Sequence, residues 1–143
     1  MVEGLESVNT VSPVKAWELM RSDPGVVLID VRSDMEFLMI GHPEGAVNVP
    51  LIDAPEWTVN EHFVANTRKA LLGRVTSKFR NANPVLLICR SGNRSQEAAA
   101  LLIEAGIREV YVIEGGFEGP LNDSHHRNTV SGWRYEGLPW AQC

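Results

Sequence analysis

The sequence predicts an α/β protein with a mainly parallel central sheet, and three observations indicate this fold class. Short apolar runs rich in β-branched residues, at positions 26–29, 46–49, 85–88 and 110–113, are typical of strands buried on both faces of such a sheet. Segments with helical spacing separate these runs, and strands that alternate with helices favour parallel pairing. The 143 residues are 44% apolar and 22% charged, as in an ordinary globular domain.

Three segments between the strands are expected to be helices. The first begins at Ser12, a residue suited to capping a helix, and ends before the Asp-Pro-Gly turn at residues 23–25. The second extends over residues 60–80, where apolar side chains recur at multiples of four and form one stripe. The third covers residues 95–105 and stops at Gly106, a favourable residue just beyond a helix.

A single domain is expected over residues 1–143, with a core from about residue 10 to residue 140. A chain of this length buries enough apolar surface to form a proper core. Residues 117–143 contain Gly, Pro, Trp and His without clear periodicity. They are therefore expected to form an irregular segment that returns over the domain.

Charge and composition exclude several classes of function. The 13 Lys and Arg residues against 18 Asp and Glu residues give a net charge of −5, and no basic tract is present, which argues against nucleic-acid binding. No apolar run approaches the ~20 residues of a membrane helix, and the first residues do not resemble a secretory signal. Two cysteines, Cys89 and Cys143, cannot make a disulfide framework. We expect a cytoplasmic protein without a membrane or nucleic-acid partner.

The most informative segment is the loop that follows the run at residues 85–88. This buried strand delivers Cys89 to the carboxyl edge of the sheet, where ligands bind in open α/β folds. Backbone N–H groups of the loop and the N-terminus of the next helix are expected to face the sulfur, while Arg90 and Arg94 add positive charge. These features favour the thiolate and make Cys89 the candidate nucleophile. The expected anion cradle consists of Arg90, Ser91, Gly92, Asn93, Arg94 and Ser95.

A cysteine at a strand end is often an inert core residue, and that is the alternative interpretation of Cys89. Two arginines, a glycine and a helix start within six residues favour the reactive interpretation instead. A phosphatase or arsenate reductase with a Cys-x5-Arg loop is a further alternative. Here four residues separate Cys89 from Arg94, which makes a smaller cradle, better matched to a terminal sulfur than to a tetrahedral phosphoryl group.

Several other motifs accompany the cysteine loop in a fixed order. They are Asp30-Val31-Arg32, Glu36-Phe37, the Gly-His-Pro-Glu-Gly-Ala-Val-Asn-Val-Pro stretch at residues 41–50, Ala98-Ala99, Leu101, Gly106, Gly115-Gly116 and Gly137-Leu138-Pro139. With these motifs, the sequence over residues 10–140 resembles the rhodanese-like sulfurtransferases. The resemblance implies a compact five-stranded parallel sheet with helices on both faces. It also implies that the cysteine accepts a sulfane sulfur, becomes a persulfide and passes the sulfur to a nucleophile.

The reaction that this resemblance implies is consistent with the residues of the loop. Cys89 attacks the outer sulfur of a small anionic donor such as thiosulfate, and Arg90 and Arg94 hold the anion while sulfite leaves. Backbone N–H groups from Arg90 to Ser95 then stabilise the persulfide. The acceptor is a thiol, cyanide or a protein. No metal or organic cofactor is needed, because sulfur itself is the covalent cargo.

Three residues outside the loop are expected to support it. Asp30 and Arg32 follow a strand at the same edge, and as a carboxylate–guanidinium pair they are expected to orient the cysteine loop; Glu36 is given the same role. The alternative is an ion pair that only ties the strand end to a helix. His42 is expected to be a structural turn residue, and the pair His125-His126 lacks the ligand spacing of a metal site.

Two features leave the function open. The segments at residues 53–83 and 117–132 are longer than is usual in the family, so the substrate preference of the family does not transfer directly. Rhodanese-like domains also serve as non-catalytic binding or regulatory modules, although such modules typically lose the cysteine. The final residue, Cys143, is a candidate resolving thiol for a persulfide or disulfide at Cys89.

Overall fold

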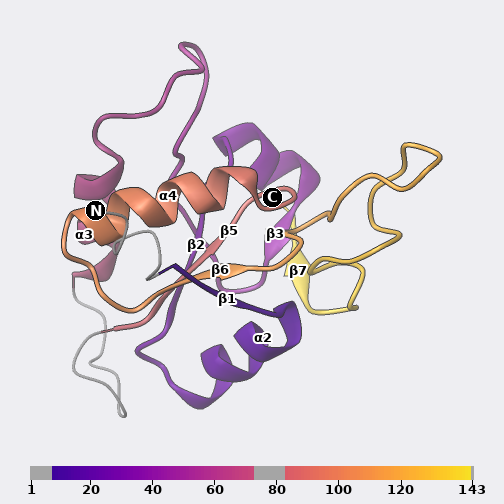
Figure 1. Cartoon of the computed structure of the whole chain (residues 1–143), viewed down its shortest axis with the longest axis horizontal. Coiled ribbons are helices and arrows are strands. Elements are labelled where there is room, and N and C mark those ends of the chain that lie inside the picture. The colour runs from indigo at the N-terminus through magenta and orange to yellow at the C-terminus, as the bar shows by residue number, and fades with distance from the viewer. Residues whose placement is uncertain (1–7, 73–82, 143) are drawn as a thin grey trace.

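Figure 1 shows the computed structural model of the chain, which describes residues 8–72 and 83–142. A central sheet of five parallel strands has the order β1-β6-β5-β2-β4. Its strands are β1 (Asn9–Val11), β2 (Val27–Asp30), β4 (Val47–Asn48), β5 (Val85–Ile88) and β6 (Val110–Ile113). Every residue of β2 and β5 is buried, as their apolar runs predict. The predicted five-stranded parallel sheet is confirmed.

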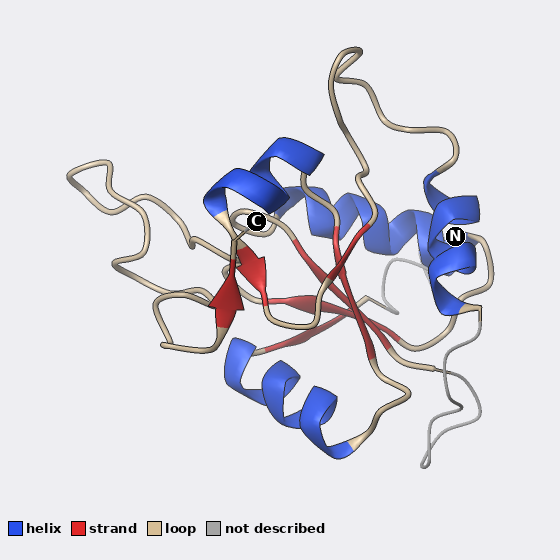
Figure 2. Cartoon of the chain, turned by 180° about the vertical axis from the view of Figure 1, so that it is seen from behind, coloured by secondary structure: helices blue, strands red, loops and turns tan. Residues whose placement is uncertain are grey.

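Helices cover both faces of this sheet, and this prediction is also confirmed. Helices α3 (Phe63–Leu71) and α4 (Asn93–Glu104) lie on one face, and α2 (Pro13–Ser22) lies on the other (Figures 1 and 2). Successive strand side chains point to opposite faces, so β5 contributes Val85 and Leu87 to the core under α3 and α4. Leu86 and Ile88 pack in the core on the α2 side.

The helix boundaries agree only in part with the sequence pattern. Ser12 caps α2 as expected, because its Oγ accepts the N–H of Lys15 at 3.1 Å. Helix α4 starts at Asn93, two residues before the predicted start, so the helix N-terminus lies closer to the cysteine. The predicted helix over residues 60–80 is observed as α3 only; its remainder from residue 73 lies outside the described residues.

Three short elements complete the fold. The single π-helical turn η1 (Glu36–Ile40) ends where the N–H of Gly41 donates to the carbonyl of Glu36. Strand β3 (His42–Pro43) pairs antiparallel with β7 (Trp140–Ala141), which returns the end of the chain to the domain. Between Ile113 and β7 the chain has no regular helix or strand, as predicted, and it is anchored by the fully buried Trp133.

The topology brings distant segments to one edge of the sheet. Because β2, β5 and β6 are parallel, their carboxyl ends at Asp30, Ile88 and Ile113 meet at the same edge. Two long loops project from the body of the domain, one after β4 and one after β6 (Figure 2). In the two described parts of the chain the longest helix, α4, has 12 residues, and no helix is long and apolar enough to cross a membrane.

Candidate active site

Cys89 follows β5 at the carboxyl edge, and its sulfur lies at the N-terminus of α4. The residue is only 1% exposed. The backbone N–H groups of Gly92 and Ser95 donate to Sγ at 3.1 and 3.3 Å. Two amides that converge on one sulfur, together with the positive end of the helix dipole, stabilise negative charge at that position. The loop therefore forms a cradle for an anionic sulfur.

Gly92 makes this tight loop possible. Its φ of +124° lies in a region that side chains with a Cβ rarely adopt, and the turn at this residue aims its own N–H at the sulfur. Its carbonyl accepts the hydroxyl of Ser95 at 3.0 Å. Ser95 Oγ in turn accepts the thiol hydrogen of Cys89 at 3.3 Å, so one side chain holds both the loop and the thiol.

The other residues of the predicted cradle differ in their exposure. Arg90 and Asn93 are exposed, and Ser91 is half-buried. In the described segments the hydrogen bonds to Sγ come from Gly92 and Ser95. The loop thus contacts the sulfur mainly through its backbone, and Arg90 is exposed to solvent.

Arg94 is paired with a carboxylate at the site, and its role in holding a donor anion stays a prediction. Its guanidinium makes a bidentate pair with Glu36, with Nη1 2.7 Å from Oε1 and Nη2 2.9 Å from Oε2. The hydrogen bond to Glu36 is the largest influence on Arg94 and raises its pKa above the ordinary value of a guanidinium; the charge of Cys89 contributes less. The carboxylate of Glu36 balances the charge of this arginine, and Arg90 is the second cation of the loop.

Glu36 remains ionised because its partners outweigh its burial. Burial is the largest single influence and acts to raise its pKa, but the hydrogen bond and charge of Arg94 and two hydrogen bonds from Ser33 lower it to about 2. Both the backbone N–H and the hydroxyl of Ser33 donate to Oε1, at 3.1 and 2.9 Å. Glu36 therefore links the segment after β2 to the first turn of α4.

Asp30 and Arg32 form the predicted pair, and Arg32 reaches the cysteine loop through Phe117, on whose ring it lies. Both side chains are fully buried, and Arg32 Nη2 lies 2.6 Å from Oδ2 of Asp30. The guanidinium also donates to the carbonyl of Gly41 and lies over the ring of Phe117, 4.6 Å from its centre. Of the three predicted supporting residues, Glu36 is the one that binds a residue of the cysteine loop.

Residues 116–119 pack directly on the backbone of the cysteine loop. The N–H of Phe117 donates to the carbonyl of Cys89 at 2.8 Å, and the N–H groups of Glu118 and Gly119 donate to that of Arg90 at 2.9 and 3.2 Å. A Cβ on Gly116, whose φ is +64°, would lie 2.5 Å from the carbonyl oxygen of Cys89. This close approach explains the glycine and fixes one side of the loop.

Sequence reasoning missed an aromatic cluster behind this contact. The ring of Phe117 meets Trp140 edge to face at 5.9 Å, and Arg134 lies 4.4 Å from the centre of the Trp140 ring. Favourable cation–π and aromatic contacts of this kind hold the irregular segment against the site. The double glycine before Phe117 was the only signal in the sequence that the chain turns sharply here.

Other polar groups lie apart from the sulfur. His42 behaves as a structural residue, because its Nδ1 lies 2.8 Å from the carbonyl of Phe37 and its ring stacks on that side chain. His125 and His126 are exposed, and no group of three or more metal-ligating side chains occurs within residues 8–72 and 83–142. Cys143 lies outside the described residues.

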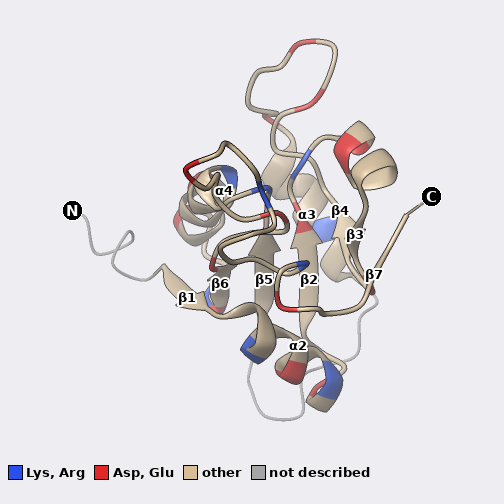
Figure 3. Ribbon diagram, turned by 90° about the vertical axis from the view of Figure 1, so that its right-hand side faces the viewer, with Lys and Arg blue, Asp and Glu red and all other residues tan. Residues whose placement is uncertain are grey.

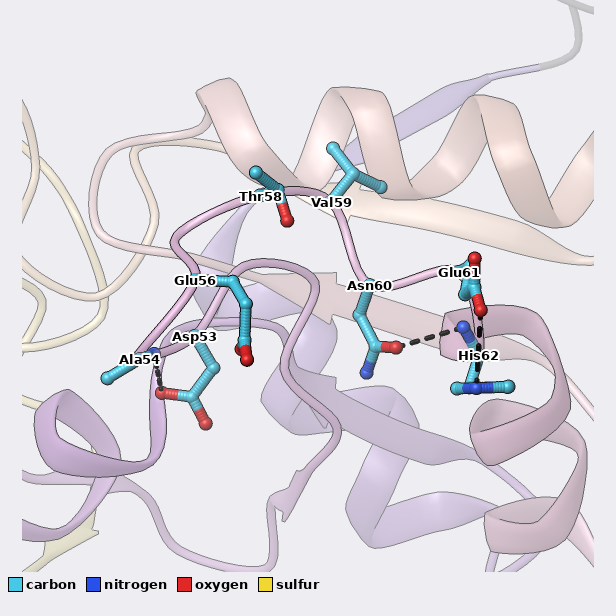
Figure 4. A pocket seen from close by; sticks show the side chains of 8 residues that line it. All are labelled: Asp53, Ala54, Glu56, Thr58, Val59, Asn60, Glu61 and His62. Carbon is cyan, nitrogen blue, oxygen red and sulfur yellow. Dashed lines mark hydrogen bonds and ion pairs between the residues drawn. The ribbon is translucent and has the colours of Figure 1, made fainter.

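A hollow of about 510 Å³ lies within the loop after β4, and Cys89 does not line it. It is lined by residues of one stretch, Asp53, Ala54, Glu56, Thr58, Val59, Asn60, Glu61 and His62 (Figure 4). Its lining includes three carboxylates and no cysteine, so its chemistry differs from that of the sulfur cradle. We assign the candidate active site to Cys89 on the basis of its hydrogen bonds.

Comparison with known proteins places the chain among relatives of similar length. The chain is 31% identical over 134 residues to an uncharacterized protein of Rickettsia conorii, covering 94% of this chain and 98% of the relative. It is 28% identical to the thiosulfate sulfurtransferase GlpE of Actinobacillus pleuropneumoniae, covering 94% of both chains. The crystal structure of Rv0390 from M. tuberculosis superposes with a TM-score of 0.79 at 37% identity, covering 94% of this chain and 98% of that one.

A family model also covers most of the chain. The model described as the rhodanese-like domain matches residues 12–122, which span β2, the cysteine loop and the double glycine after β6. This range contains the sulfur cradle and all of its hydrogen-bond donors. The protein therefore belongs to the family of rhodanese-like domains, whose members similar to this chain include sulfurtransferases.

Proposed function

We propose that this protein is a sulfurtransferase that carries a sulfane sulfur on Cys89. The observation that carries the proposal is the convergence of two backbone N–H groups on Sγ at the N-terminus of α4. A persulfide places its negative charge one atom beyond Sγ, and a cradle of amides stabilises such an anion. The similarity to relatives named thiosulfate sulfurtransferase supports the same reaction class.

The proposed reaction has two steps. In the first, the thiolate of Cys89 attacks the outer sulfur of thiosulfate, a new S–S bond forms, and the bond to the sulfonate sulfur breaks. The electron pair of that bond leaves with sulfite, and the enzyme holds a persulfide. In the second, a nucleophile such as cyanide or a thiolate attacks the outer sulfur, and Cys89 leaves as the thiolate.

Each group at the site has a part in this reaction. Ser95 accepts the thiol hydrogen in the resting state, and its N–H remains on the sulfur after ionisation. Arg90, which is exposed and has no ion pair among the described residues, attracts the dianionic donor. Arg94 acts through Glu36 to hold the first turn of α4, and it is a positioning residue.

The alternatives receive less support from the site. A non-catalytic module would not require a sulfur surrounded by donors, and here both amides are in place. A phosphatase of the Cys-x5-Arg class needs a free arginine at the end of its loop to bind the phosphoryl group. Here Arg94 is already paired with Glu36, and the loop is one residue shorter. The cytoplasm, where thiols remain reduced, is the compartment we propose for this chemistry.

The test is turnover of thiosulfate with cyanide, followed as thiocyanate. We expect Cys89→Ser to abolish turnover, because the hydroxyl cannot carry the sulfane sulfur. Cys143→Ser is the matched control, since it removes the other cysteine of the chain, and it should retain turnover. Turnover by Cys89→Ser at the rate of the natural protein would refute the proposal.

A further inference from the structure

A second feature of the carboxyl edge is an acidic, partly apolar surface next to the cysteine loop. We call it the acidic face and define it by the segment Asp34–Met39 and the loop after β4. Its exposed carboxylates belong to Asp34, Glu56 and Glu61, and Asp53 is half-buried beside them. Residues 51–62 contain no Lys or Arg, and the projecting loop at the top of Figure 3 accordingly shows acidic positions and no basic one.

The two parts of the acidic face adjoin each other and the active site. The N–H of Asp34 lies 3.4 Å from Oδ1 of Asp53, which joins the loop to the segment before η1. Glu36 lies two residues after Asp34 and binds Arg94 in the first turn of α4. A partner bound to the acidic face would therefore lie beside the loop that carries the reactive sulfur.

Large apolar side chains are exposed on this surface. Met35 and Met39 are 62% and 61% exposed, and Trp57 in the adjoining loop is 59% exposed. Methionine and tryptophan are enriched where proteins bind one another, since methionine adapts its shape and tryptophan offers a large contact area. Thiosulfate is too small to contact several of these side chains at once. A macromolecular partner can bury them in an interface.

The hollow in the loop gives the surface a shape that suits a basic side chain. Its volume is about 510 Å³, and its lining includes the carboxylates of Asp53, Glu56 and Glu61. Figure 4 shows the side chain of Glu56 directed into the space that the loop encloses, while the carboxylate of Asp53 accepts the N–H of Ala54. Each carboxylate accepts hydrogen bonds from a lysine or arginine, and the apolar stem of such a residue packs against exposed methionine or tryptophan.

We propose that the acidic face docks a basic segment of a partner protein, and that this segment carries the cysteine that accepts sulfur from Cys89. The sulfur-accepting part of this inference rests on the proposed function. A second copy of this chain is a poor occupant, because like charges would meet across a symmetric contact and the whole chain carries a net charge of −5. A basic partner is attracted to the same surface over a longer range.

The test compares two short synthetic peptides with a central cysteine, one flanked by lysine and leucine and the other by glutamate and leucine. The protein is first loaded with thiosulfate, and transfer to each peptide is followed by mass spectrometry. We expect the basic peptide to react at least about tenfold faster at low salt, and this advantage to shrink as salt screens the charges. Dithiothreitol serves as a small acceptor that does not need the docking surface.

Variants of exposed residues connect the preference to this surface. Glu56→Lys combined with Glu61→Lys should reduce transfer to the basic peptide roughly tenfold and leave transfer to dithiothreitol unchanged. Glu18→Lys combined with Glu104→Lys is the matched control, since it changes the net charge equally and both residues are exposed outside the acidic face. Equal rates with the two peptides, or the same loss in this double control, would overturn the proposal.

A binding measurement separates this proposal from the proposed function. The basic peptide with serine in place of cysteine is titrated into the unloaded protein, and binding is followed by fluorescence polarisation of a labelled peptide. Binding that weakens with Glu56→Lys and Glu61→Lys supports the docking surface even if thiosulfate fails to load Cys89. Failure of the peptide to bind, in a protein that does load, overturns the docking surface and leaves the sulfurtransferase intact.

Discussion

The pair between Glu36 and Arg94 makes a quantitative prediction about stability. Glu36→Gln keeps the size of the side chain but removes the charge that balances Arg94. Lowering a carboxyl pKa from 4.5 to about 2 corresponds to an upper bound of roughly 3 kcal/mol. The Glu36 side chain is 20% exposed and solvent screens part of this interaction, so we expect a loss of about 1–2 kcal/mol at pH 7.

The dependence on pH distinguishes this interaction from simple packing. The pKa of Glu36 is lower in the folded protein than in the unfolded chain, so its contribution is complete above about pH 4.5 and is lost as the pH falls toward 2. Urea titrations of the natural protein and Glu36→Gln between pH 7 and pH 3 should show free energies of unfolding that converge in acid. Glu18→Gln, an exposed control on α2, should remain within about 0.5 kcal/mol throughout. A difference for Glu36→Gln that stays constant down to pH 3 would refute the reasoning.

Three further predictions concern the surroundings of the cysteine loop. Gly116→Ala places a Cβ 2.5 Å from the carbonyl oxygen of Cys89 and should lower the free energy of unfolding by roughly 1–3 kcal/mol in urea; an unchanged midpoint would contradict the close approach. Asp30→Asn leaves the fully buried guanidinium of Arg32 without its counter-charge and should cost roughly 3–5 kcal/mol in the same assay, and a loss below about 1 kcal/mol would argue against the pair. Replacing residues 124–128 with a Gly/Ser linker should preserve persulfide formation but change the ratio of transfer rates to small and bulky thiols. An unchanged ratio would mean that this segment only covers the surface.

The sheet could be predicted from the sequence because its central strands are locally distinctive. Strands β2, β5 and β6 are continuous apolar runs, and burial on both faces requires that composition. Strand β1 was not predicted, because its three residues include exposed Asn9 and Thr10 and it lies at the edge of the sheet. An edge strand of this length has no periodic signal.

The active site could be predicted only as far as local sequence determines it. Cys89, Gly92 and Ser95 lie within seven residues, so a strand, a tight turn and a helix start place the amides on the sulfur. Arg94 pairs with Glu36, which lies 58 positions earlier in the chain. No local sequence pattern indicates that these two residues form an ion pair. The π-helical turn that presents Glu36 has no sequence pattern comparable to the apolar stripe of an α-helix.

The packing of residues 116–119 on the loop is likewise a tertiary effect. Gly115 and Gly116 indicated a sharp turn at the correct edge, but the hydrogen bonds to the carbonyls of Cys89 and Arg90 depend on how β5 and β6 align. The register of two parallel strands is set by the whole sheet. The sequence therefore predicted where this segment begins. It did not predict that the segment binds the backbone of the cysteine loop.

The central claim is that Cys89 carries the transferred sulfur, and the mass of the protein after incubation with thiosulfate tests it most directly. We expect the intact protein to gain a single sulfur atom, the gain to map to the proteolytic peptide that contains Cys89, and cyanide to remove it. The hydrogen bonds to Sγ from Gly92 and Ser95 predict that the adduct persists long enough to be observed. An unmodified protein, or a sulfur found on Cys143 while Cys89 remains unmodified, would contradict the account.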